Sequence, residues 1–205
     1  RQQVGSQAPV IDKLRLFYNH PGFIEPLADR VAAALSEFSE AGPDGVELVF
    51  TAHSLPMAMA EKCAYEAQLR EACTLVCAQI DRAQWRLAYQ SRSGPPSQPW
   101  LEPDILDVLE ELHGAGRAQG VVVAPIGFLS DHMEVVYDLD VEARQKADEL
   151  GLEMVRAATV GTHPRFVQMI RELIVERTDP NSSRPALGQF GPGPDVCPPG
   201  CCPPR

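Results

Sequence analysis

The sequence predicts an α/β protein with a parallel β-sheet flanked by helices, as in flavodoxin-like and Rossmann-like domains. Short apolar runs alternate with longer segments whose apolar residues recur every three or four positions, which is typical of strands alternating with helices. Such alternation favours right-handed crossovers and therefore a parallel sheet. The chain has 205 residues, 44% of them hydrophobic, which is enough for one sizeable core or one domain with an appendage.

Five short segments are predicted to be strands. They are residues 13–17, 46–51, 85–90, 120–126 and 153–158.

Five amphipathic segments are predicted to be helices. The first, near 22–38, places apolar residues at mostly four-residue steps, and the second, near 58–80, does the same. The third begins at Pro103, since proline is favoured in a first helical turn. The fourth covers about 132–150, and the last, near 164–177, opens with Thr162 and Pro164.

The chain loses this periodicity from about Thr178. Eight of the 19 prolines fall within residues 178–205. A Pro/Gly-rich segment without apolar periodicity does not build a core, so we expect residues beyond about 180 to be poorly ordered. The chain also starts at Arg1, which suggests a piece of something longer or a processed product.

Composition narrows the functional classes. The net charge is −10 and the pI is near 4.9, which argues against nucleic acid as a partner. The longest apolar runs, such as 121–129, are far shorter than the ~20 residues of a membrane span. No signal-peptide pattern is present, so we expect a cytoplasmic protein without a transmembrane segment.

The six cysteines form two sets. Cys63, Cys73 and Cys77 lie in a predicted helix, where small apolar packing is their expected role. The tail holds Cys197, Cys201 and Cys202, and metal ligation would explain three thiols there. The alternative is a tail with incidental cysteines.

Polar residues follow three of the predicted strands. His53 lies in TAHSLP, Trp100 and Arg92 lie in QSRSGPPSQPW, and Asp131, His132 and Glu134 lie in FLSDHMEVVYDLDVE. In a parallel sheet the carboxyl ends of strands share one edge, so these groups could line a single crevice. Taken singly, His53 could be a loop histidine bonded to backbone, Trp100 a cap on the core, and Glu134 a surface acid.

Glu134, Asp138 and Glu142 are spaced at i, i+4 and share one helix face. Neighbouring like charges repel, so this acidic row is either a solvated surface or a path for cations. Imidazole facing carboxylate suits a divalent metal such as Fe(II), and it also suits proton transfer near neutral pH. The histidines at positions 20, 113 and 163 are expected to be structural.

The stretches FTAHSLP, YQSRSG…PW and APIGFLSDHMEVVYDLD resemble the three signature stretches of ferrochelatases, in that order. The resemblance extends over most of residues 13–177. It implies a chelatase-type α/β fold and the insertion of Fe(II), as substrate, into a porphyrin to give a haem.

The resemblance also implies roles for individual residues. The positions matching His53 and Glu134 face each other across the macrocycle as metal ligands or proton handlers, with Asp131 and His132 beside them. The positions matching Asp138 and Glu142 continue the metal path, and those matching Trp100 and Ser54 contact the porphyrin.

The tail resembles that of ferrochelatases from high-GC Gram-positive bacteria. This implies a [2Fe–2S] cluster held by Cys197, Cys201 and Cys202, with a fourth cysteine upstream of Arg1. It implies coproporphyrin III as the porphyrin, with protoporphyrin IX the alternative. Residues 1–158 would be the second of two similar domains without its first strand, 159–178 a helix packing on the absent first domain, and 179–205 the cysteine tail.

Two rival functional classes remain open. One is a non-catalytic metal- or haem-binding module, which a truncated chain favours, and the other is a chelatase for another metal such as cobalt or nickel. Those chelatases pair histidines, whereas this chain pairs His53 with Glu134. The sequence contains no Gly-rich phosphate-binding loop, which argues against a nucleotide-binding protein.

We expect the protein to be a monomer.

Overall fold

The computed structural model describes residues 5–9, 11–38, 45–95, 97–116 and 118–196. Its centre is a parallel sheet of four strands in the order β2-β1-β3-β4. The strands are β1 (Val46–His53), β2 (Arg86–Gln90), β3 (Gly120–Ala124) and β4 (Glu153–Arg156). The predicted fold class is therefore confirmed, and four of the five predicted strands are present.

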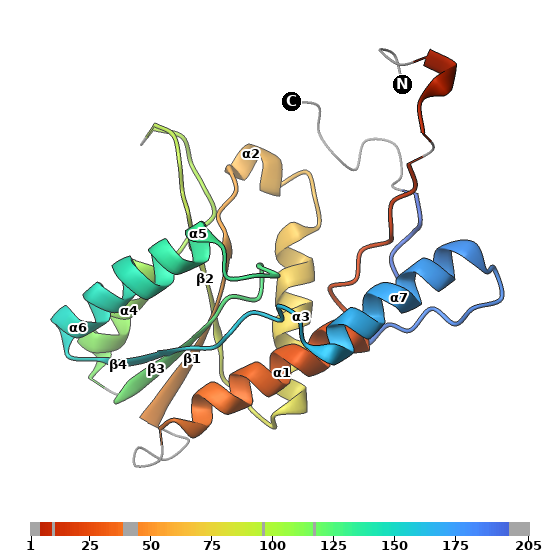
Figure 1. Ribbon diagram of the computed structural model, residues 1–205. Helices are drawn as coiled ribbons and strands as arrows, with labels where there is room; N and C mark the ends of the chain where they lie inside the picture. The colour runs from red at the N-terminus through yellow and green to blue at the C-terminus, as the bar shows by residue number, and fades with distance from the viewer. Residues whose placement is uncertain (1–4, 10, 39–44, 96, 117, 197–205) are drawn as a thin grey trace.

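Helices cover both faces of the sheet (Figure 1). One face carries α1 (Pro21–Ser36) and α3 (Tyr65–Gln79), preceded by the short α2 (Met57–Ala60). The other face carries α4 (Ile105–Ala115) and a long helical segment made of α5 (Met133–Val135), η3 (Val136–Ala143) and α6 (Arg144–Leu150). The last helix, α7 (Pro164–Thr178), packs on α1, and a short 3₁₀ turn, η1 (Gly5–Gln7), lies near the amino terminus.

Strand alternation divides the core into two apolar layers. In β1, Leu48 and Phe50 face α1 and α3, whereas Val49 faces α4 and the α5–η3–α6 segment. All five strand residues of β3 are buried, as expected of a central parallel strand. The chain leaves β1 toward one face and leaves β3 toward the other, so the carboxyl ends of these neighbouring strands form a topological switch point.

The prediction of a strand at 13–17 is wrong. The segment does not pair with any strand of the sheet. Its charged residue is buried and its apolar neighbour is exposed: Arg15 is 4% exposed, whereas Leu16 is 52% exposed. The cause is a distant carboxylate, because Arg15 donates two hydrogen bonds to Glu176 on α7, at 2.6 and 3.0 Å.

Two predicted helices differ in detail from the structure. The helix expected near 58–80 is broken between α2 and α3, so Cys63 lies in an exposed turn and not in a helix. Cys73 and Cys77 are buried in α3, as expected of packing residues. The helix expected near 132–150 is continuous but contains a π-helical stretch, η3.

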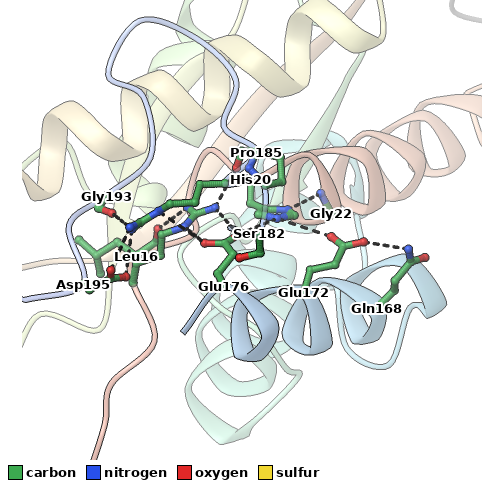
Figure 2. Close-up of polar contacts among 12 residues, drawn as sticks. Leu16, His20, Gly22, Gln168, Glu172, Glu176, Ser182, Pro185, Gly193 and Asp195 are labelled. Carbon is green, nitrogen blue, oxygen red and sulfur yellow. Dashed lines mark hydrogen bonds and ion pairs between the residues drawn. The ribbon is translucent and has the colours of Figure 1, made fainter. Parts of the chain in front are cut away.

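The expectation of poor order beyond residue 180 is wrong for residues 181–196. We call residues 179–196 the strap. It has no helix or strand, but it is held at several points: Asn19 donates to the carbonyls of Leu187 and Gly191, and Arg184 pairs with Asp195 at 2.9 Å. Figure 2 shows how Glu176, Pro185, Gly193 and Asp195 gather in one polar network with His20 and Glu172. Cys197, Cys201 and Cys202 lie outside the described residues.

Candidate functional site

The candidate site lies at the carboxyl edge of the sheet, where β1 and β2 end side by side. His53 is the last residue of β1, and its register partner in β2 is Gln90. Alternation places His53 on the face of Val49, which is the face covered by the α5–η3–α6 segment. His53 and the helix that carries Glu134 are therefore on the same side of the sheet.

The ring of His53 is held in one tautomer. Its Nδ1 lies 2.6 Å from the carbonyl oxygen of Ser54. A carbonyl only accepts, so this hydrogen bond requires the proton on Nδ1. In the neutral ring Nε2 then keeps its lone pair. The half-buried His53 can therefore accept a proton at Nε2.

Ser54 is fixed from two directions. Its N–H donates to the Gln90 carbonyl at 2.8 Å, and its hydroxyl donates to the Leu101 carbonyl at 2.9 Å. Ser54 is 2% exposed, so its hydroxyl makes its hydrogen bond within the protein and not with solvent. In the structure, Ser54 therefore presents a rigid backbone carbonyl to His53.

Tyr65 supports the same strand end from the opposite face. Its hydroxyl donates to the His53 carbonyl at 3.0 Å. Burial raises the pKa of Tyr65 to about 12, with a smaller contribution from the Cys63 thiol. The phenol therefore remains a donor throughout the neutral range.

The acidic row follows the helical segment as predicted, but its members differ in environment. Glu134 and Glu142 are exposed, whereas Asp138, in η3, is half-buried. Asp138 Oδ2 accepts from Gln90 Nε2 at 3.3 Å and also from the hydroxyl of Ser91. The middle acid of the row is therefore held by the end of β2.

A polar cavity of about 170 Å³ adjoins this row. Asp104, Asp138 and Glu142 are its acidic lining, together with Gln90 and Ser91. Burial raises the pKa of Asp104; the Leu106 N–H opposes this, and the carboxylates of Asp107, Asp138 and Glu142 add to it. Arg92 also lines the cavity, so three carboxylates and one guanidinium border it, and the lining is negative on balance and favours cations.

Asp131 and His132 are less central than the sequence suggested. Asp131 pairs with Arg156, at the end of β4, at 2.9 Å, and Arg156 also binds Asp140. This places Asp131 beside β4, two strands away from His53 in the sheet order. His132 is exposed, and its ring lies edge-on to Phe128 with centroids 5.4 Å apart.

Trp100 closes the loops that follow β1 and β2. It forms an isolated antiparallel bridge with Pro56, and Leu101 donates to the Leu55 carbonyl at 2.9 Å. Its ring is half-buried, and its indole N–H has no partner among the described residues. Backbone contacts therefore hold the loop after His53 against the loop that contains Trp100.

The described residues contain no group of three His, Cys, Asp or Glu side chains able to hold a metal ion. A metal at His53 and Glu134 would thus need further donors, which a macrocycle or additional protein residues could provide. The described part of the chain also has no helix long and apolar enough to cross a membrane.

Sequence reasoning missed four contributors to the site: Tyr65, Gln90, Ser91 and Asp104. Two signals for them were present. Gln90 and Ser91 belong to the QSRSG stretch already singled out, and Asp104 directly follows Pro103, where a helix was predicted to begin. The helix begins at Ile105 instead, with Asp104 as its N-cap. Their contacts with Asp138 and with its cavity depend on the packing of distant segments.

Comparison with known proteins gives consistent matches. A family model described as Ferrochelatase matches residues 1–178. The ferrochelatase of Rhodopirellula baltica is 52% identical over 202 residues, which cover 98% of this chain and 57% of that protein. Coproporphyrin III ferrochelatases of Frankia alni and Streptomyces griseus are 52% and 47% identical, covering 96% and 98% of this chain and 53% and 58% of theirs.

The chain thus spans little more than half the length of these curated relatives. Among solved structures, a multi-domain protein of Deinococcus radiodurans, described as structurally similar to chelatases, matches with a TM-score of 0.49 and 17% identity. That match covers 93% of this chain and 38% of the other, and it is too distant to carry an argument.

Proposed function

Because this chain belongs to the ferrochelatase family, we propose that the full-length protein inserts ferrous iron into a porphyrin, in haem biosynthesis. The observation that carries the proposal is the arrangement of His53, whose tautomer leaves Nε2 as a base, on the sheet face that also carries the acidic row. Coproporphyrin III is the proposed porphyrin, because the relatives from Frankia alni and Streptomyces griseus carry that substrate in their names. Protoporphyrin IX is the alternative.

His53 is proposed to remove protons from the macrocycle. Two pyrrole N–H protons must leave as the metal enters, and a neutral imidazole accepts a proton near neutral pH. The Ser54 carbonyl would then stabilise the imidazolium, since it already accepts from Nδ1. Glu134, on the same sheet face, is proposed to share metal and proton handling with His53, and Asp131 and His132 are proposed to assist from the preceding loop.

The acidic row is proposed to deliver iron. Ferrous iron is a divalent cation for which carboxylate and imidazole are suitable ligands. Glu142 and Asp138 line the negative cavity, and Glu134 lies one further step along the same helix face. Trp100 and Ser54 are proposed to border the porphyrin.

Variants of the full-length protein test this assignment. We expect His53→Ala to lower iron insertion by a factor of about 10²–10⁴, the usual worth of a general base. Glu134→Gln should also be severely impaired, whereas Asp138→Asn and Glu142→Gln should be milder. The matched control is His113→Ala, which alters a histidine in the last turn of α4, outside the site. Anaerobic assays with Fe(II) and coproporphyrin III measure the rates, and near-normal turnover by His53→Ala would refute the role of His53.

The tail cysteines are proposed as three of four thiolate ligands of a [2Fe–2S] cluster, with the fourth upstream of Arg1. Four ligands are required, and burial raises the pKa of Cys73 well above its usual value and that of Cys77 to about 11, so neither is a ready thiolate. The exposed Cys63 is the remaining alternative within this chain. The visible absorption of the anaerobically purified full-length protein, compared with that of this 205-residue chain, tests the proposal. A stoichiometric cluster in the shorter chain would contradict an upstream ligand.

A further inference from the structure

Ser91 has an unusual backbone conformation at the end of β2. Its φ of 62° is in the left-handed region, and Asp81 is the only other described non-glycine residue with a positive φ. A serine there costs on the order of 1 kcal/mol, and such strain persists only where the surroundings impose it. The conformation places the Ser91 hydroxyl on Asp138 Oδ2, as its donor.

Gln90 holds the same carboxylate from the neighbouring position. Its side-chain amide donates to Asp138 Oδ2 and to the backbone carbonyl of Glu134, each at 3.3 Å. Gln90 is 1% exposed, and its backbone carbonyl accepts a hydrogen bond from the Ser54 N–H. One residue thus connects the strand end of His53 with two successive members of the acidic row.

The two contacts make Asp138 different from its neighbours in the row. Glu134 and Glu142 are exposed, but Asp138 has a fixed oxygen with two donors. Gln90 Oε1 is buried and has no partner among the described residues, and Gln90 lines the cavity that Asp104, Asp138 and Glu142 make negative. Gln90 thus contributes an amide that holds Asp138 and an unpartnered buried oxygen beside the same cavity wall.

We propose that Ser91 and Gln90 are positioning residues that orient Asp138 for the passage of ferrous iron along the acidic row. The inference rests on the proposed function, because it concerns the iron route of the same site. Neither residue touches iron in this scheme. Both act through Asp138, by keeping one of its oxygens occupied and leaving Oδ1 for the cation.

Ser91→Ala in the full-length protein tests the proposal. A hydrogen bond to a charged group is worth about tenfold or more, so we expect the KM for Fe(II) to rise about tenfold. The kcat at saturating iron and the KM for coproporphyrin III should stay within about twofold, since iron delivery alone is altered. The matched control is Ser36→Ala, which removes an exposed hydroxyl bonded to the Ala33 carbonyl at the end of α1.

A double-mutant cycle with Asp138→Asn separates positioning from general stability. If Ser91 acts through Asp138, the serine change should add little in the Asp138→Asn background, so the effects should not be additive. Additive effects would overturn the proposal. Ser91→Gly provides a second check, because glycine accepts the left-handed backbone but lacks the hydroxyl. A Ser91→Gly protein with a normal KM for Fe(II) would likewise overturn it.

Calorimetry of Fe(II) binding without porphyrin distinguishes a failure of the positioning role from a failure of the proposed function. If the wild-type protein binds Fe(II) about tenfold more tightly than Ser91→Ala but does not turn over, the positioning role stands and the proposed function fails. If the wild-type protein turns over but both proteins bind iron equally and share one KM, the positioning role fails alone.

Discussion

Arg15 shows at the residue scale how one distant partner reverses a local pattern. Leu14 and Leu16 are 38% and 52% exposed, and the arginine between them is 4% exposed. A buried charge requires compensation by a partner and hydrogen bonds, and Glu176 with the Pro185 carbonyl supplies both. No local rule of alternation contains this information, because the two charged residues are 161 positions apart.

His20 is a residue whose charge state is determined by the same network. Its Nδ1 accepts from the Gly22 N–H at 3.0 Å and caps α1, while Nε2 lies 3.6 Å from Glu172 (Figure 2). Burial lowers the pKa of His20, and Arg15 and Arg165 lower it further, against opposing contributions from Glu172 and Glu176. The native state therefore favours the neutral ring.

We predict that His20 makes the protein less stable in mild acid. A native pKa below the unfolded value of about 6.5 stabilises the fold above that pH, and this contribution is lost as the pH falls toward the native pKa. Thermal unfolding at pH 7.5 and pH 5.5 measures the effect. His20→Asn retains a capping acceptor but does not titrate, so its Tm should fall less between the two pH values. Equal decreases for both proteins would contradict the prediction.

At the element scale, the acidic helix is informative because its regular pattern conceals a change of helix type. Residues 136–143 are π-helical, whereas the i, i+4 spacing predicted one continuous α-helix. Single π-helical turns inside α-helices are frequent at functional sites. Here the stretch contains Asp138, which Gln90 and Ser91 hold from β2, so the sheet fixes the position of the helix.

The start of α4 combines a structural and an electrostatic role in Asp104. Its side chain accepts from the Leu106 N–H at 2.9 Å and caps the helix. Burial and the neighbouring carboxylates raise its pKa, so the ionised form weakens the fold above that pKa. The penalty disappears as the pH falls below the unfolded value of about 3.9.

We predict opposite outcomes for two changes at this cap. Asp104→Asn keeps the acceptor and removes the repelled charge, so its Tm at pH 7 should equal or exceed that of the wild type, with the advantage shrinking toward pH 4. Asp104→Ala removes the cap and should cost about 1 kcal/mol. Thermal unfolding of the wild type and the two variants at pH 7 and pH 4 measures these differences in Tm. A lower Tm for Asp104→Asn at pH 7 would show that the charge is favourable there.

At the scale of the whole molecule, the strap joins the end of the chain to its beginning. It contacts the amino-terminal segment through Arg15 and Asn19, and it contacts α3 where the Gln189 N–H donates to Glu71. Leu187 also packs against the core between α1, α3 and the sheet. Near its carboxyl end, the strap passes beside Leu16 at Gly193, so both of its halves contact the amino-terminal segment.

We predict that Arg15→Met destabilises the chain by up to about 3–5 kcal/mol, because it removes the closest partner of the buried Glu176 and leaves it with the longer contacts to Arg184 at 3.9 Å and His20 at 4.0 Å. The double variant Arg15→Met/Glu176→Leu should regain much of this loss, since both charges are then gone. Urea denaturation measures the free energy of unfolding. The single variant should also be cleaved faster by chymotrypsin at Phe190, within the strap.

The control for this comparison is an exposed pair of the same kind. Arg70 and Glu66 are one helical turn apart, their side chains are 2.7 Å from each other, and about half of each side chain is exposed (55% and 43%). Arg70→Met should change the unfolding free energy by less than about 1 kcal/mol. If Arg15→Met were equally mild, the buried pair would not be what holds the strap.

The α/β class, four of the strands, and the positions of His53 and the acidic row could be predicted from the sequence, because each depends on local periodicity and on the shared edge of parallel strands. The tautomer of His53, the hydrogen bonds from Gln90 and Ser91 to Asp138, the cavity around Asp104 and the order of the strap became visible only in the tertiary structure. The last three depend on contacts between residues that are distant in the chain. The tautomer depends on the adjacent Ser54 carbonyl, whose direction is set by the hydrogen bonds from Ser54 to the distant Gln90 and Leu101 carbonyls. Local apolar patterns carry the energy of burial, but they do not specify which polar partner satisfies a buried group.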